Sequence, residues 1–138
     1  MPGIDACLLE AMTLPGARGA AIVDWTSGLA LGSIGESAGG DHEATAVETA
    51  EMARAAAEYS VFTPDDHRTP LGDLPEPAGL PAVEDLMVTT RTAFHLIHFV
   101  ETTFDSSVFL YLWLDRETGN LALARIRLRG LAERLVLG

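Results

Sequence analysis

Residues 108–114 read Val-Phe-Leu-Tyr-Leu-Trp-Leu, a run without a single polar position. Successive side chains of a β-strand point to opposite faces of its sheet, so a strand of this composition must be covered on both faces. The run is therefore predicted to be a central strand with helices above and below it. This places the chain in the α/β class.

Two further strands are predicted just before the central one, over Leu86–Thr90 and Ala93–Glu101. The connections are only Arg91-Thr92 and Thr102–Ser106, which are too short for a parallel crossover and favour antiparallel pairing. Near the N-terminus, two short apolar runs, 19–23 and 29–34, flank the turn-like sequence Trp25-Thr26-Ser27-Gly28. They predict a β-hairpin.

Three helices are predicted around these strands. Ile4–Met12 carries apolar residues at helical spacing, and His42–Ser60 contains no Gly or Pro and follows Asp41, a favourable N-cap. Residues 120–129 alternate as a strand would, but an apolar stripe at helical spacing continues to Leu135, which favours a helix capped by Asn120. Five of the nine arginines lie from Arg116 onward, so this segment should be attracted to the acidic remainder of the chain.

Composition narrows the possible functions. A chain of 138 residues that is 48% apolar fits a single domain, 1–138, with its own core. All nine basic residues are arginine, and twenty acids give a net charge of −11, which disfavours nucleic acid and anionic membranes as partners. Without lysine there is no P-loop lysine and no Schiff base. With no signal peptide or membrane span recognised, a cytoplasmic protein is expected.

One long connection interrupts this pattern. Residues 62–82 hold five of the seven prolines together with several acids and have no apolar periodicity. A segment of this length without secondary structure is usually either functional or disordered. It is interpreted as a proline-rich acidic loop within the domain.

No chemical site emerges from the polar residues. His95 and His98 are three apart on a predicted strand, so they should point to opposite faces and cannot share a metal ion. Asp41-His42-Glu43 is interpreted as a helix start, where acids bind free N–H groups. Asp65-Asp66-His67 lacks a nucleophile motif, and Cys7 is a lone core thiol. We expect no catalytic residue, no metal and no cofactor, and a binding module is favoured.

The element order and its joints resemble the Roadblock / dynein light-chain family. The similarity lies in residues 14–24, which read LPGARGAAIVD, in Ser27–Leu31 after the turn, and in the acid-led, alanine-rich helix from Asp41. It continues in Leu114-Asp115-Arg116 and in residues 119–125, which read GNLALAR. The resemblance covers nearly the whole chain, but the connection 62–82 is longer and richer in proline than the family pattern.

The resemblance implies a profilin-like α/β/α sandwich with a five-stranded antiparallel sheet of order 2-1-5-4-3 and helices on both faces. It also implies a dimer in which the long helices pack antiparallel and the third strands extend the sheet. Bacterial members of the family bind a small Ras-like GTPase and regulate it, without providing catalytic residues of their own. A ligand-sensing domain is the alternative, and a hydrolase that uses residues 65–67 is the least favoured reading.

Two sets of candidate site residues follow. The homodimer interface is assigned to the small residues of the long helix, which permit close approach, and to the third strand, which would otherwise be an unprotected sheet edge: Ala46, Ala50, Ala53, Ala57, Leu86 and Val88. The opposite, acidic arc of the helix is assigned to the partner surface, with Val47 as its apolar centre: Glu43, Val47, Glu51, Arg54 and Glu58.

Overall fold

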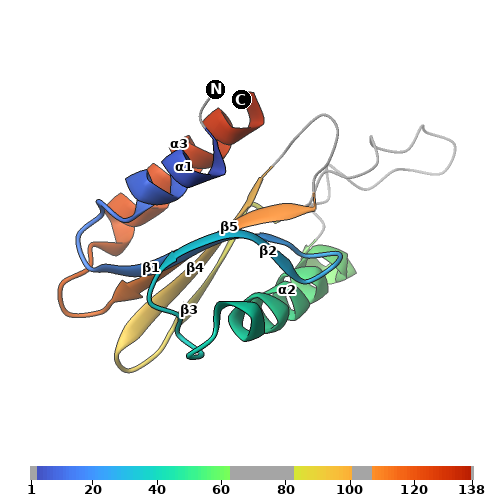
Figure 1. Ribbon diagram of the computed structural model, residues 1–138. Helices are drawn as coiled ribbons and strands as arrows, with labels where there is room; N and C mark the ends of the chain where they lie inside the picture. The colour runs from blue at the N-terminus through green and yellow to red at the C-terminus, as the bar shows by residue number, and fades with distance from the viewer. Residues whose placement is uncertain (1–2, 63–82, 101–106, 138) are drawn as a thin grey trace, which may run out of the picture.

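The computed structural model describes residues 3–62, 83–100 and 107–137. A five-stranded antiparallel sheet of order β2-β1-β5-β4-β3 has α1 and α3 on one face and α2 on the other (Figure 1). This is the predicted fold class. The elements in chain order are α1 (Ile4–Ala11), β1 (Ala17–Asp24), β2 (Leu29–Gly35), α2 (His42–Glu58), the 3₁₀ helix η1 (Ser60–Phe62), β3 (Asp85–Thr89), β4 (Ala93–Val100), β5 (Val108–Asp115) and α3 (Leu121–Leu137).

The predicted central strand lies at the centre of the sheet. β5 pairs with β1 on one side and with β4 on the other, for example Val23 with Phe109 and Leu96 with Leu112. Its even-numbered leucines pack under α1 and α3, whereas Phe109 and Tyr111 pack under α2. The absence of a polar position in this strand is thus explained by cover on both faces.

The C-terminal segment is a helix, as the longer apolar stripe predicted. Asn120 caps it, since its side-chain oxygen accepts a hydrogen bond from the N–H of Leu123 at 3.0 Å. The expected attraction is visible in two ion pairs from α3, between Arg125 and Asp85 at 2.9 Å and between Arg134 and Glu10. The apolar stripe of α3 lies against the sheet. Its buried members are Ala124, Leu128, Leu131 and Ala132. Leu121 and Leu135 are partly buried.

Two close backbone approaches explain the glycines at the predicted joints. Gly16 has a φ of 80°, and a Cβ there would lie 2.6 Å from the backbone of Gly119. A Cβ at Gly19 would lie 1.9 Å from the carbonyl oxygen of Glu36. The breaks at Pro15-Gly16 and Gly119-Asn120 therefore bring two turns into contact at one end of the sheet.

Several predicted bounds shift slightly, and one element was missed. The long helix ends at Glu58, and residues 60–62 form η1, so Phe62 belongs to a 3₁₀ helix and not to the proline-rich loop. Residues 63–82, which carry the candidate hydrolase group Asp65-Asp66-His67, lie outside the described residues. In the part of the chain that the structure describes, no helix is long and apolar enough to cross a membrane.

Candidate interaction surfaces

The alanine row of α2 lies in the core of the protomer. Ala46, Ala50 and Ala53 are at most 2% exposed and pack on β1 and on the aromatic residues of β4 and β5. Ala57 is partly buried against the same cluster. Their assignment to the dimer interface is therefore corrected, because the sheet of the same chain already covers them. A stripe of small residues permits close approach, but it does not say whether the neighbour is a sheet or a second helix.

The acidic arc of α2 is on the surface, as predicted. Glu43, Glu51 and Glu58 are exposed, and Val47 is 48% exposed among them. Asp41 caps the helix by accepting a hydrogen bond from the Glu43 N–H at 3.0 Å, which confirms the structural reading of this acidic cluster. The arc is therefore a continuous acidic surface with one apolar side chain.

Arg54 differs from the other residues assigned to this arc. Its Nε and Nη2 donate hydrogen bonds to the carbonyl oxygen of Trp25 at 3.2 and 2.9 Å, and its side chain is partly buried. Arg54 thus fastens α2 to the turn between β1 and β2. It therefore has a structural role at the border of the arc, and its assignment to the partner surface stays a prediction, because only two of its five N–H donors are bound to Trp25.

The two edges of the sheet are protected differently. At one edge, β2 is irregular, since the register shifts between Ile22 and Val23 and leaves Leu31 outside the pairing. At the other, β3 pairs regularly with β4 over its whole length. Bulges discourage added strands, whereas a regular strand with apolar side chains invites them. The β3 edge is therefore the better candidate for pairing with another chain.

The side chains of β3 agree with this assignment. Leu86 is partly buried against the core under α2, and Val88, on the same face, is 36% exposed. Met87, on the opposite face, is 40% exposed. Both Leu86 and Val88 thus lie on an edge strand whose apolar cover is incomplete in a single protomer.

An aromatic shelf lies on the α2 face of the sheet, next to Val88. It consists of Arg18, His95, Tyr111 and Trp113. The rings of His95 and Trp113 are nearly parallel, with 6.3 Å between their centres. The Arg18 guanidinium lies 3.8 Å from the centre of the Trp113 ring. The Tyr111 hydroxyl and His95 Nδ1 form a hydrogen bond of 2.7 Å. His95 and Trp113 remain only partly buried.

The histidines confirm the predicted strand geometry. His95 belongs to this shelf, whereas His98 faces the α3 side near Asp85. Burial lowers the pKa of both imidazoles, although Asp85 and Glu84 oppose the effect at His98. Burial also raises the pKa of Tyr111 to about 12. The two histidines cannot share an ion, and no group of three or more His, Cys, Asp or Glu suited to a metal occurs among residues 3–62, 83–100 and 107–137.

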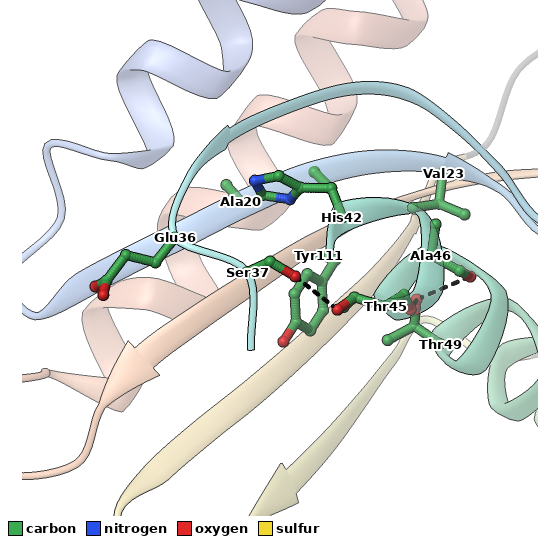
Figure 2. A pocket seen from close by; sticks show the side chains of 10 residues that line it. Ala20, Val23, Glu36, Ser37, His42, Thr45, Ala46, Thr49 and Tyr111 are labelled. Atoms are coloured by element: carbon green, nitrogen blue, oxygen red, sulfur yellow. Dashed lines mark hydrogen bonds between the residues drawn. The ribbon is translucent and has the colours of Figure 1, made fainter. Parts of the chain in front are cut away.

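The hollow at the start of α2 and the hollow between α1 and α3 are both lined by described residues, and both are small. The first lies between the start of α2 and β1, where Figure 2 shows Tyr111 beside Ser37 and Thr45. Its free volume is about 10 Å³, room for about one water molecule, and the second, between α1 and α3, has about 40 Å³. Ligand sites are usually several hundred Å³, so neither hollow favours the ligand-sensing alternative.

Comparisons with known proteins identify the fold. No family model matches the sequence, and no curated protein matches it. Among solved structures, the chain is similar to Myxococcus xanthus MglB with a TM-score of 0.72 and 19% identity, over 96% of this chain and 84% of that one. It is also similar to a Roadblock/LC7 domain from Streptomyces avermitilis, with a TM-score of 0.68 and 14% identity over 95% and 92% of the two chains.

A third similar structure is MglC from Myxococcus xanthus, with a TM-score of 0.59 and 18% identity over 97% of both chains. At these identities the likeness concerns the fold alone. The chain therefore has the Roadblock/LC7 fold, and the resemblance inferred from the sequence is confirmed at that level.

Sequence reasoning missed the shelf. Its members come from β1, β4 and β5, and they are brought together only by the register of three strands. The available signal was the pair of ring positions Tyr111 and Trp113, which the alternation of β5 places on one face.

Proposed function

We propose that this protein is a homodimeric regulatory or scaffolding protein of the Roadblock type that acts in the cytoplasm and binds a small Ras-like GTPase. In this proposal it modulates the GTPase by contact and supplies no catalytic residue, metal or cofactor. The observation that carries the proposal is the combination of this fold with a regular, incompletely covered edge strand β3 and an exposed acidic α2.

The dimer in this proposal pairs the β3 strands of two copies and places their α2 helices antiparallel on the same face. Since the alanine row is buried, the helices must meet through another side of α2. Val47 and Arg54 lie toward the β1–β2 turn, and Thr45 and Thr49 lie toward Tyr111. The side of α2 that points toward β3 is therefore the row of residues next to Thr45 and Thr49 on the helix surface. This row consists of Glu48, Met52, Ala55 and Tyr59.

The GTPase in this proposal binds the acidic arc of α2. Val47 supplies an apolar contact, and Glu43, Glu51 and Glu58 supply a polar rim that attracts a basic surface and speeds encounter. Val47 packs toward Gly28 of the β1–β2 turn on one side and is 48% exposed on the other, so part of its apolar surface is open to a partner.

The test measures binding of Ras-like GTPases from the source organism, each loaded with GDP or with a non-hydrolysable GTP analogue. Val47→Asp should weaken binding by about 1–3 kcal/mol without changing the melting temperature, because the side chain is exposed. Leu9→Asp is the matched control, since Leu9 is 59% exposed on α1 on the other side of the sheet. If no GTPase binds in either nucleotide state, the proposal fails. Equal losses for both variants would remove α2 as the binding face.

A further inference from the structure

The structure contains a second exposed apolar group, located at the C-terminal end of α2. Tyr59, Val61 and Phe62 are 59%, 75% and 49% exposed. Tyr59 is the C-cap residue of α2, and the other two belong to η1, whose Phe62 N–H donates to the Tyr59 carbonyl at 3.2 Å. Three large apolar side chains are thus exposed to water within four residues, and an exposed apolar patch of this kind marks an interaction site.

The aromatic shelf lies beyond the opposite end of the same helix. The first turns of α2, with Thr45 and Thr49, line one hollow together with Tyr111 (Figure 2). His95 and Trp113 continue from Tyr111 away from the helix, and Val88 pairs with His95 on β3. A single chain thus carries an exposed apolar segment at the end of α2 and a half-covered shelf just beyond its start.

In the proposed homodimer, a two-fold axis would bring these two surfaces together. When two identical helices pack antiparallel, the end of each lies next to the beginning of the other. In such an isologous contact every pair occurs twice. Charge contributes through one pair only, because Glu58 precedes Tyr59 and the shelf end of the sheet carries the exposed Arg91. Arg18 already pairs with Glu36 of its own chain at 3.3 Å.

We propose that the shelf formed by Arg18, His95, Tyr111 and Trp113, with Val88 at its border, is the docking site for the segment Tyr59–Phe62 of a second copy of this chain. This inference rests on the proposed homodimer and specifies which surfaces hold it together. The aromatic side chains supply large apolar contact area with little conformational freedom to lose. Each dimer contains two such contacts.

A mixing experiment tests the inference in a Cys7→Ala background, since Cys7 is buried and is the chain's only cysteine. One copy carries Phe62→Cys, and the other, enlarged by a tag, carries Val88→Cys. A short bismaleimide should join the two into a product of mixed size. The matched control replaces Phe62→Cys by Leu9→Cys, because Leu9 is even more exposed, at 59% against 49%, but lies on α1. Light scattering on the same samples reports the oligomeric state.

The outcomes separate the inference from the proposed dimer. A dimer that cross-links through residue 62 but not through residue 9 supports the inference. A dimer without this preference overturns the docking site and leaves the homodimer intact, whereas a monomer at micromolar concentration overturns both. If a chain carrying both cysteines cross-links only within itself, its own segment occupies the shelf and the inference is wrong.

A binding measurement provides a second readout. Phe62→Asp should raise the dimer dissociation constant about 10- to 100-fold, as expected for a central aromatic contact that occurs twice. Leu9→Asp should leave it unchanged. If both variants have the same effect, the docking site is overturned.

Discussion

The two faces of the sheet solve the same packing problem in different ways. On one face, α1 and α3 cover a core of leucines, with Leu110, Leu112 and Leu114 at most 1% exposed. On the other, α2 alone packs its alanines closely on β1 and leaves His95 and Trp113 partly uncovered. A face with two helices is complete within one chain, whereas a face with one helix has room for a partner. The difference shows which face is fully covered within one chain and which face has incomplete apolar cover.

The largest change in the free energy of unfolding is expected for a substitution in the alanine row of α2, and it tests whether this face is core. Ala53 is fully buried between α2 and the sheet, so Ala53→Arg would force a charged side chain into an apolar core. We expect a loss of about 4 kcal/mol or more in the free energy of unfolding, measured by urea denaturation, or no soluble protein at all. Ala44→Arg, on the exposed side of the same helix, should change it by less than about 0.5 kcal/mol.

The same variant also tests the corrected role of the row. If Ala53→Arg gave a folded monomer of normal stability, the row would be a dimer interface and not core. Such a result would contradict the packing described here.

The sequence predicted the layers but not the division of surfaces. The apolar run 108–114 predicted cover on both faces of the sheet, as observed. The alternation of side chains along β4 predicted that His95 and His98 lie on opposite faces, which is also observed. The alanine stripe of α2, in contrast, has the same periodicity whether it packs on a sheet or on a second helix. The contact between Arg54 and Trp25 joins residues 29 positions apart and has no local signal. The periodicity of the sequence was therefore enough to predict the layers of the fold. To decide which residues form the surface, the register of the strands had to be known.

The second prediction concerns the face that is complete. Leu128 on α3 is 2% exposed in the core under α1 and α3. Leu128→Ala should lower the free energy of unfolding by about 2–5 kcal/mol, because it removes buried methyl groups and leaves a cavity between helix and sheet. Ile126→Ala on the same helix should have an effect within about 0.5 kcal/mol, since Ile126 is 68% exposed.

This pair of variants also tests whether the α1/α3 face of the sheet takes part in association. Leu128→Ala should leave the dimer dissociation constant unchanged as long as the protein stays folded, because this face is covered within one chain. If the variant were to dissociate the dimer while the protomer remains folded, the α1/α3 face would take part in association.

The smallest expected effect is on the titration of the two histidines. Burial lowers the pKa of both His95 and His98, so the folded state favours the neutral imidazoles. Their contribution to stability is present above the unfolded pKa of about 6.5 and is lost as the pH falls through the lower folded pKa. The free energy of unfolding should therefore decrease from pH 7 toward pH 5, and the decrease should be smaller in His95→Gln and His98→Gln.

Nuclear magnetic resonance titration can assign this effect to a face. In the Phe62→Asp variant the shelf would be open to water in a larger fraction of molecules, so the pKa of His95 should move up toward its ordinary value. His98 lies under α3, beside Asp85 and away from the shelf, and its pKa should not change. Equal shifts at both histidines would indicate general loosening of the fold. An unchanged His95 in a dissociated variant would mean that the partner does not cover the shelf, because cover by a second copy must alter the solvation of this ring.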